Sequence, residues 1–575
     1  MAAESQFHAK EWFRSAADAP IEHNRMSSAD ATPARSGRVA ALLVASGILL
    51  SRVVGLVRER VLATYFGTGL HADVFSAGLR MPNVLQNLLG EGTLSASFIP
   101  VYSELLGQGK TKEAGRVAGA AFALLLGIAG TIALLGIVFA PFLVTVFTPG
   151  FEGQRRELMI TVVRILFPMT GVLVLSAWSL GILNSHRKFF VPYFAPVLWN
   201  AGIIAVLAVA YAHMDSAGRV DLDQLLMAAA WGALLGGFLQ FGFQLPWVLK
   251  ADREIRLNTG RAEPGFHDVL KNAGPAILGR GVVQISSYVD LVLASLLAVG
   301  AVSRLRFAQT LYVLPVSLFG MSIAAAELPE LSRERGAGMD VLRARAITAA
   351  RRVTFFVLPS CIAFIALGDV LVAGIYRSGA FGDADVLIVW ATLAAYSLGL
   401  VASTTTRIYQ SAFYALRDTT TPARIAGARV LTSAMFGAGL MLQFEGLTIA
   451  GATLPAGALG ALRIEGLPLG PVGLALGASI GAWLEWTLLR RSLARLVGSV
   501  GVGRSHLVRT ASAGLLAAAA GHAMHILVLA LHPILIALCV VSVFGAVYVG
   551  LAYALGLDEA RAFIGALRRR AGRFG

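Results

Sequence analysis

Charged residues are scarce in this sequence. Only 14% of its 575 residues are Asp, Glu, Lys or Arg, whereas soluble domains carry about 25%. Apolar runs of about 20 residues recur along nearly the whole chain, and each is long enough to cross a bilayer core of about 30 Å. The deficit of charge excludes a soluble enzyme of this length. The apolar runs predict an all-α polytopic membrane protein.

Cysteines, metal-ligand clusters and nucleotide-binding loops are also rare or missing. The two cysteines, Cys361 and Cys539, both lie in apolar runs, which excludes a disulfide framework. His522 and His525 are three residues apart, with no third ligand close in sequence. No Walker A loop, Ser/His/Asp set or pair of catalytic carboxylates stands out. We therefore predict a protein that is not an enzyme and holds no metal or cofactor.

Positive charges follow an alternating pattern along the chain, whose formal net charge is +15. With the N-terminus in the cytoplasm, most Lys and Arg residues fall in every second loop, as the positive-inside rule requires. The loops predicted to face outside hold only Arg155, Arg156, Arg219, Arg304, Arg306, Arg377 and Arg463. Membrane topology thus explains the net charge, removes nucleic acid as an expected partner and places both termini in the cytoplasm.

The apolar runs predict about fourteen transmembrane helices. Residues 1–36 are polar and are expected to form a disordered cytoplasmic tail. Residues 37–250 and 251–495 are expected to form two six-helix lobes. Residues 496–575 are expected to form a terminal helix pair followed by a basic cytoplasmic tail.

The two predicted lobes resemble each other in sequence. Short motifs recur at an offset of about 230 residues, which indicates an internal duplication. The matched positions are Pro82 and Pro315, Pro100 and Pro329, Gly150 and Gly379, and Pro192 and Pro422. Six helices are an even number, so both copies enter the membrane in the same direction. The prediction is two parallel repeats around a central cleft, a plan typical of alternating-access transporters.

The segment SRVVGLVRE places two arginines inside a predicted membrane helix. On a helical wheel, Arg52, Gly55, Arg58 and Glu59 share one arc of about 120°, with apolar residues on the rest. A central Arg costs at least about 2.5–3.5 kcal/mol in lipid, so this polar stripe is expected to line a wet cavity. Arg60 points away from the stripe and is expected to be structural.

Further ionisable residues fall within or near the predicted spans. They are Asp73, Arg80, Glu91, Arg164, Arg280, Asp290, Glu327, Arg407 and Glu485. Arg52, Arg58 and Arg80 lie close together in the first lobe. They predict a cationic cavity for an anion, because Arg can bind phosphate in a bidentate geometry. A structural pairing of these arginines with Glu59 or Asp73 is the alternative.

The acidic residues of the second lobe divide into two groups. Asp290 is our candidate for a site that couples transport to a cation or a proton. Glu327 and Glu485 are expected near helix ends, where a structural ion pair is the favoured interpretation.

Four segments are similar to one known family. They are SRVVGLVRE, ADVFSAGLRMPNVLQNLLGEGTLSASFIPVYSE, GILNSHRKFFVPYFAPVLWN and FYALRDTTTPARI. They resemble the MurJ/MviN family of bacterial lipid II flippases, from about residue 37 to the C-terminus. The resemblance implies the fold of the multidrug/oligosaccharidyl-lipid/polysaccharide exporter superfamily, with a terminal helix pair that forms a groove for a lipid tail. It also implies transport of a lipid-linked peptidoglycan precursor from the inner to the outer leaflet of the cytoplasmic membrane.

The resemblance also implies site residues. By this match the substrate-binding residues are Arg52, Arg58, Asp73, Arg80, Glu91 and Arg306. Gln86, Asn87 and Thr310 stand where many members carry arginine, and Arg306, one turn before Thr310, is expected to substitute there. Some members bind sodium near the seventh and eleventh helices, where Asp290 would correspond to the aspartate.

Two other functions stay open. The uncharged Gln86, Asn87 and Thr310 favour an exporter of another polyprenyl-linked glycan or of an amphipathic drug. A non-transporting scaffold for cell-wall enzymes would have no need for arginines inside the membrane. The expected partners are an anionic lipid of the undecaprenyl pyrophosphate type, membrane lipids and cell-wall synthesis enzymes. The expected location is the bacterial inner membrane.

Overall fold

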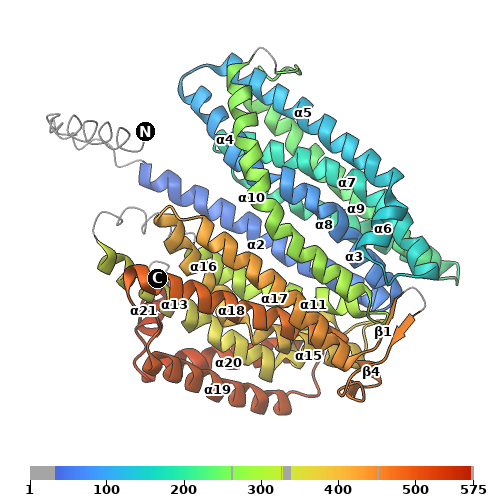
Figure 1. The fold of residues 1–575 in the computed structure, drawn as a ribbon, viewed down its shortest axis with the longest axis vertical. Coiled ribbons are helices and arrows are strands. Elements are labelled where there is room, and N and C mark those ends of the chain that lie inside the picture. Colours follow the sequence, from blue (N-terminus) through green and yellow to red (C-terminus); the bar gives the residue numbers. More distant parts are fainter. Residues whose placement is uncertain (1–32, 261–262, 325–326, 328–337, 450–451, 572–575) are drawn as a thin grey trace, which may run out of the picture.

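The computed structural model describes residues 33–571, except 261–262, 325–326, 328–337 and 450–451 (Figure 1). The predicted disordered tail lies outside the described residues up to residue 32. Residues 33–36 of that tail instead belong to a long helix, α2, which spans Pro33–Phe66.

The first lobe is built from α2 and the helices that follow it. These are α3 (Leu70–Leu89), α4 (Glu91–Gly107), α5 (Thr111–Val138), α6 (Ala140–Phe147), α7 (Gly153–Ser185), α8 (Phe190–Ser216) and α9 (Leu222–Ala251). Two of the predicted spans are broken, one between α3 and α4 and the other between α5 and α6. The first break falls at Gly90, where a Cβ would lie only 2.1 Å from the Gln86 carbonyl oxygen.

The second lobe repeats this sequence of helices. It contains α10 (Pro264–Ser295), α11 (Ala301–Pro315), the π-helical turn η1 (Val316–Met321), α13 (Met339–Ala366), α14 (Gly368–Tyr376), α15 (Asp383–Ser397), α16 (Leu400–Ala415), α17 (Thr420–Phe444) and α18 (Gly470–Val497). The connection from α17 to α18 carries two short antiparallel hairpins that the sequence did not predict. They pair β1 (Leu447–Ile449) with β2 (Ala452–Leu454), and β3 (Arg463–Ile464) with β4 (Leu467–Pro468).

Every described helix from α2 to α20 overlaps one of the spans predicted from the sequence. Within the described residues, ten helices are long and apolar enough to cross a membrane. The number is eleven if α15 and α16, bent by 40°, form one span. The prediction of an all-α polytopic membrane protein is confirmed, whereas the exact number of fourteen stays a prediction.

The duplication is visible in helix packing and in helix endings. Helix α8 packs on α9 as α17 packs on α18, and α5 packs on α7 as α13 packs on α16. Arg187 and Arg417, which are equivalent in the repeat, both have positive φ, at 57° and 62°. Each ends a helix in a Schellman motif, in which Lys188 N–H donates to Leu183 O and Asp418 N–H donates to Phe413 O. Left-handed residues other than glycine are uncommon, so their recurrence supports two copies of one unit.

The two lobes are joined by α2 and α10 and by a shared core. Helix α2 lies along α8 of its own lobe, whereas α10 packs against α3 and α4 of the first lobe as well as against α17 and α18 (Figure 1). The largest cluster of buried apolar side chains draws residues from both lobes, among them Phe66, Phe75, Leu305 and Phe381. Burial of apolar surface therefore holds the lobes together where these helices meet.

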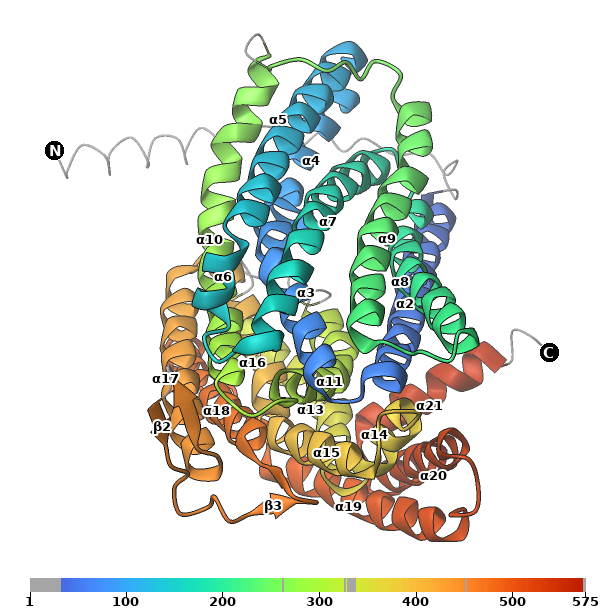
Figure 2. The same cartoon turned by 90° about the vertical axis from the view of Figure 1, so that its right-hand side faces the viewer.

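The terminal segment forms a helix pair and one further helix. Helix α19 (Arg504–Leu527) packs against α13, and α20 (Pro533–Ala554) packs against α14. Figure 2 shows that α19 lies at the opposite end of the molecule from α5. The predicted basic tail is not extended, because Asp558–Ala571 forms helix α21.

A candidate anion-binding site between the lobes

The centre of the candidate site is one carboxylate shared by two arginines. Arg58 Nη2 lies 2.5 Å from Glu59 Oε1, and Arg306 Nη2 of the second lobe donates to the same oxygen at 2.7 Å. The guanidinium of Arg58 also stacks over the Trp199 ring, 4.8 Å from its centroid. Arg306 further donates to Ser76 Oγ at 3.1 Å. Two cations and one anion leave an excess positive charge in a largely buried position.

Arg80 adds a third cation at the boundary between the lobes. It lies close enough to Arg306 to repel it electrostatically, and it donates to Gln309 Oε1 of the second lobe. Gln309 in turn donates to the hydroxyl oxygen of Tyr396 at 2.8 Å. Arg58, Arg80 and Arg306 are called the arginine cluster below. Such a cluster suits a multivalent anion, because each guanidinium presents several N–H donors.

Arg52 lies apart from the cluster. It is exposed, about two helical turns before Arg58 on α2, and none of the contacts among the described residues joins it to the other arginines. Gly55 lies between them and faces Asn200, whose Oδ1 would be 3.9 Å from an added Cβ. The predicted polar stripe is therefore divided, with Arg58 and Glu59 in the site and Arg52 nearer the predicted cytoplasmic end.

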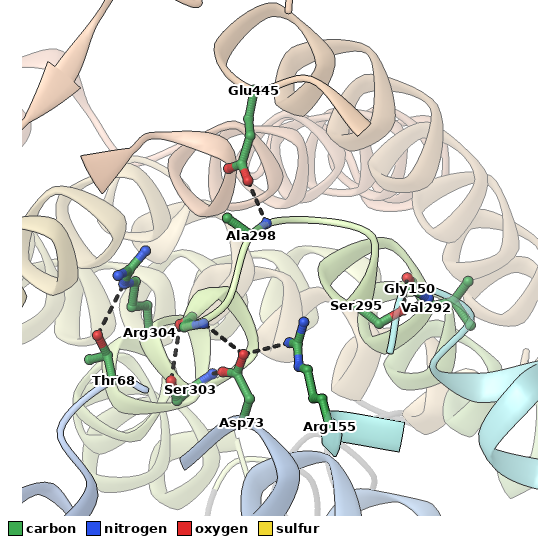
Figure 3. Close-up of polar contacts among 11 residues, drawn as sticks. Thr68, Asp73, Gly150, Arg155, Val292, Ser295, Ala298, Ser303, Arg304 and Glu445 are labelled. Atoms are coloured by element: carbon green, nitrogen blue, oxygen red, sulfur yellow. Dashed lines mark hydrogen bonds and ion pairs between the residues drawn. The ribbon is translucent and has the colours of Figure 1, made fainter. Parts of the chain in front are cut away.

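Asp73 lies in a buried contact between the lobes (Figure 3). It is fully buried and accepts the N–H groups of Gly300 and Ser303, both at 2.7 Å, at the start of α11. Arg155 Nη2 donates to the same carboxylate at 2.5 Å. Asp73 of the first lobe thereby caps a helix of the second lobe, where the helix dipole favours a negative charge.

Thr68 and Glu445 extend this contact (Figure 3). Arg304 Nε donates to Thr68 Oγ1 at 3.2 Å, and Thr68 donates to Asp385 Oδ1 at 2.5 Å. Glu445 accepts the N–H of Ala298 at 2.5 Å. Burial raises the pKa of the Glu445 carboxyl above its ordinary value, although the Ala298 N–H and the Arg304 charge oppose that rise.

Two glycines of the repeat make reciprocal contacts at the same end of the molecule. A Cβ at Gly379 of the second lobe would lie 2.3 Å from the carbonyl oxygen of Thr64 in α2. A Cβ at Gly150 of the first lobe would lie 2.2 Å from the carbonyl oxygen of Ser295 in α10. Ala380, which follows Gly379, donates its N–H to Thr64 O at 2.8 Å. We call the contacts of Asp73, Gly150 and Gly379 the outer inter-lobe contact, because the charge pattern predicts that this end faces outside.

Asp290 lies in a second polar cavity of about 180 Å³ between α10 and the other helices of the second lobe. The cavity is lined by Asp290, Gln309, Tyr312, Val313, Tyr396, Arg429, Ala478 and Ser479. Arg429 also pairs with Glu485, at 2.7 Å. Among the described lining residues Asp290 is the single carboxylate, and the described residues contain no group of three or more His, Cys, Asp and Glu that could hold a metal. The Arg429 guanidinium on the wall disfavours any added positive charge, a proton on Asp290 as well as a sodium ion.

The remaining predicted residues occupy varied positions. Glu327 pairs with Arg345 and Arg352, at 3.0 and 3.3 Å, and Glu485 pairs with Arg429, as the structural interpretation of both acids requires. Arg60 donates to the carbonyl oxygens of Gly374 and Ile375 at the end of α14, which is also a structural role. The side chains of Glu91 and Arg280 lie outside the part of the chain that the structure describes.

Gln86, Asn87 and Thr310 do not join the arginine cluster. Gln86 and Asn87 line a cavity inside the first lobe. Thr310 donates its hydroxyl to Arg306 O at 2.9 Å, one turn along α11. Arg306, one turn before Thr310, contacts Glu59, and its substitution for an arginine at position 310 stays a prediction.

Comparisons with known proteins now bear on the family. Residues 62–462 match the family model described as lipid II flippase MurJ. The chain belongs to this family. A lipid II flippase MurJ of Burkholderia cenocepacia is 34% identical over 401 residues, which cover 68% of this chain and 76% of that protein. A probable lipid II flippase MurJ of Bdellovibrio bacteriovorus is 30% identical and covers 90% of this chain and 95% of its own length. The resemblance to the MurJ/MviN family is thus confirmed.

Solved structures agree on the fold. A lipid II flippase MurJ in an inward closed conformation superposes with a TM-score of 0.69 at 23% identity, over 90% of this chain and 99% of that chain. An inward-facing MATE family transporter of the MOP superfamily superposes with a TM-score of 0.58 at 18% identity, over 76% and 96% of the two chains. The predicted superfamily fold is confirmed.

Several residues of this MurJ-family site were missed or misplaced at the level of sequence. Trp199 and Gln309 carry no charge and lie far in sequence from the arginines that they contact. Arg155 and Arg304 were counted with the outside loops, but they lie in the first turns of α7 and α11 and are 6% and 4% exposed. Their pairing with acidic or hydroxyl groups of other helices was the missing signal, and a single sequence does not contain it.

Proposed function

We propose that this chain is a flippase for a lipid-linked, pyrophosphate-bearing peptidoglycan precursor of the lipid II type. It moves the precursor from the inner to the outer leaflet of the bacterial inner membrane by alternating access. The observation that carries the proposal is the arginine cluster, because Arg58 and Arg306 come from different lobes and share Glu59. Pyrophosphate is a multivalent anion of the kind that such a cluster binds.

Glu59 acts in this proposal as a stand-in for the substrate. Its Oε1 bridges Arg58 of the first lobe and Arg306 of the second, and its Oε2 is buried without a partner among the described residues. An incoming pyrophosphate supplies more acceptor oxygens and replaces Glu59 between Arg58 and Arg306. Substrate binding then changes the contacts between the lobes, which is what a ligand must do to shift a conformational equilibrium.

The outer inter-lobe contact is the second element of the mechanism. In the state described here, Asp73, Gly150 and Gly379 bind the other lobe at the predicted outer end. Alternating access requires these contacts to break while the inner ends of the lobes approach each other. No covalent bond is made or broken, so the residues bind and release the substrate without acting as acids or bases on it.

Asp290 is the proposed coupling residue. It shares a small polar cavity with Arg429, and Gln309 lies on both the cavity wall and the contact to Arg80. Protonation of Asp290 would remove its negative charge, so that Glu485 alone would neutralise Arg429. The net charge of the cavity would therefore depend on the protonation state of Asp290. We propose proton coupling on this ground, with the sodium alternative tested below.

Orientation and partners complete the proposal. The charge asymmetry supports cytoplasmic termini and an inner-membrane location. Enzymes that make the lipid-linked precursor at the inner leaflet, and enzymes that polymerise it outside, are the natural neighbours of such a transporter. A C-terminal green fluorescent protein fusion is expected to fluoresce, because that protein matures in the cytoplasm. A dark but membrane-inserted fusion would contradict the orientation.

Growth of a flippase-depleted bacterium tests the function. Arg58→Ala and Arg306→Ala are expected to abolish rescue, while immunoblots show membrane levels equal to those of the unmodified chain. Arg463→Ala is the matched control, because Arg463 is exposed on the β3 hairpin and donates only to Gly466 O among its described contacts. Normal growth with both cluster variants would contradict the proposal.

A related exporter of another polyprenyl-linked glycan is the second candidate. The uncharged side chains at Gln86, Asn87 and Thr310 favour it, because they remove cations expected in a lipid II site. A binding assay that compares lipid II with other undecaprenyl pyrophosphate sugars decides between the two. Tighter binding of a different glycan by about tenfold, or about 1.4 kcal/mol, would favour the second candidate.

A further inference from the structure

A separate polar cavity of about 490 Å³ lies inside the first lobe. Its walls come from five helices, α3, α4, α7, α8 and α9. They are lined by Gln86, Asn87, Gly92, Ser95, Leu173, Ser176, Ala177, Leu180, Pro192, Pro196 and Gln240. No member of the arginine cluster lines this cavity. The mechanism proposed above leaves it without a role.

The described residues of this wall are polar but uncharged. Gln86, Asn87 and Gln240 bear amides, and Ser95 and Ser176 bear hydroxyls, whereas none of the described lining residues is Asp, Glu, Lys or Arg. Amides and hydroxyls offer both donors and acceptors. A phosphate would find no cation among the described lining residues, so this wall suits a neutral ligand rich in hydroxyl and amide groups.

Ser176 accepts hydrogen bonds from two neighbouring amides. Gln240 and Gln244 both donate to Ser176 Oγ, at 2.8 and 2.6 Å. These two bonds hold both side-chain amides in place and leave the hydroxyl proton of Ser176 able to donate. The side-chain amide oxygen of Gln240 remains as an acceptor on the cavity wall. Ser176 itself is buried, which gives its hydrogen bonds more weight than they would have in water.

Helix geometry relates the cavity to the arginine cluster. Asn87 follows Arg80 by seven residues on α3, which places it on the same face, two turns and about 10 Å away. Pro192 precedes Trp199, the residue beneath Arg58, by the same seven residues on α8. The step from Arg80 to Asn87 and the step from Trp199 back to Pro192 both lead toward the predicted cytoplasmic end. Two independent helices therefore place the cavity next to the cluster on its inner side.

We propose that this cavity is the carbohydrate subsite of the transporter, and this proposal rests on the proposed function. The arginine cluster binds the pyrophosphate, and the cavity binds the hydroxyl and acetamido groups of the sugar attached to it. Gln86, Asn87, Ser176 and Gln240 are then specificity-determining residues that read the neutral part of the head group. The uncharged residues at positions 86 and 87 mark a change of ligand at that wall, from phosphate to sugar.

The test compares two ligands that differ only in the head group. Purified protein in detergent is titrated with undecaprenyl pyrophosphate and with lipid II, which adds the disaccharide and its peptide. The unmodified protein is expected to bind lipid II more tightly. Gln240→Leu is expected to weaken lipid II binding about tenfold, the cost of one or two lost hydrogen bonds, and to leave undecaprenyl pyrophosphate binding unchanged.

Controls separate the subsite from folding and from the cluster. Gln86→Leu, on a different helix, is expected to show the same selective loss. Gln108→Leu, an exposed amide that donates to Glu104, is expected to show none. Arg58→Ala is expected to weaken both ligands. Gel filtration and thermal unfolding verify that each variant is folded.

Different failures point to different conclusions. If lipid II and undecaprenyl pyrophosphate bind the unmodified protein equally, the carbohydrate subsite is wrong while the proposed function stands. The same conclusion follows if Gln240→Leu and Gln86→Leu weaken both ligands in parallel, or neither. If the unmodified protein binds neither ligand, the proposed function itself is contradicted, and the subsite with it.

Discussion

Arg306 of the second lobe and Glu59 of the first form a 2.7 Å ion pair with side chains that are 16% and 4% exposed. The pair joins α11 to α2 at the level where Arg58 stacks on Trp199. A buried ion pair contributes little net stability, because desolvation offsets much of the Coulomb attraction. Its position between two lobes makes it a better candidate for a switch than for a source of stability.

Glu59→Gln tests whether the carboxylate competes with the substrate. The change removes the negative charge and keeps the shape of the side chain, which leaves Arg58 and Arg306 without an anion. Affinity for undecaprenyl pyrophosphate is expected to rise about tenfold, whereas transport in a flippase-depleted strain is expected to fall, since the bridge between lobes is lost. Unchanged or weaker binding by a folded variant would mean that Glu59 does not occupy the place of the anion.

Asp73→Asn tests the outer inter-lobe contact. The substitution removes the charge that accepts the Gly300 and Ser303 N–H groups of the second lobe, and a hydrogen bond to a charged group contributes about 1.5–3 kcal/mol. Because the contact exists only while the outer ends are closed, this loss shifts the population toward states that are open outside. A disulfide between Thr64→Cys and Ser378→Cys reports the closed state, since the two native hydroxyl oxygens are 2.6 Å apart.

The cross-linking experiment needs a background without Cys361 and Cys539. Cross-linking is expected to be efficient there, and Asp73→Asn is expected to reduce it several-fold. Asp215→Asn, an exposed aspartate in the last turn of α8, is the matched control. Equal cross-linking in the Asp73 variant and the control would remove Asp73 from the closing contact.

Gly150→Ala and Gly379→Ala test the reciprocal glycine contacts. An added Cβ would lie 2.2 or 2.3 Å from a carbonyl oxygen of the other lobe, so the lobes must separate to accept it. Both variants are expected to lose transport by at least tenfold. Gly379→Ala is expected to be the more destabilising because φ at Gly379 is +55°. Gly130→Ala, which has open space around it, is expected to transport normally.

Asp290→Asn tests the coupling proposal. Transport into vesicles is expected to lose its dependence on an imposed pH gradient, while binding of undecaprenyl pyrophosphate stays within twofold, because Asp290 lies outside the arginine cluster. Replacing sodium with choline is expected to leave the unmodified protein unaffected, because the proposal assigns coupling to a proton. Dependence of the unmodified protein on sodium would contradict proton coupling, and an unaltered pH response in Asp290→Asn would remove Asp290 from coupling.

Much of the fold was predictable because bilayer physics leaves strong patterns in a sequence. Hydropathy and charge alternation gave the helices, and recurring prolines and glycines gave the repeat, which the Arg187 and Arg417 helix endings now support. A helical wheel predicted that Arg58 and Glu59 share a polar stripe, and both side chains lie in the contact between the lobes.

Other features depend on contacts between distant segments. Arg52 lies on the same arc of the helical wheel as Arg58 but at a different position along the helix axis. A helical wheel does not show position along that axis. The charge pattern predicts Arg155 in an outside loop, whereas in the structure α7 begins at Gly153 and Arg155 donates to Asp73. The β1–β2 hairpin and α21 are short or amphipathic, so hydropathy, which marks membrane spans, gave no signal for either.

The Gly150 and Gly379 contacts make the outer seal a two-fold isologous interface folded into a single polypeptide, with each half offering the same patch to its duplicate. Such an interface is self-complementary. Because both contacts join the same two lobes at the same end, we expect a separation of the lobes there to break both. The outer inter-lobe contact is therefore expected to open at both glycines together, and a substitution of either glycine is expected to weaken the whole contact. Gene duplication thus supplies cooperativity between the two glycine contacts without any additional residue.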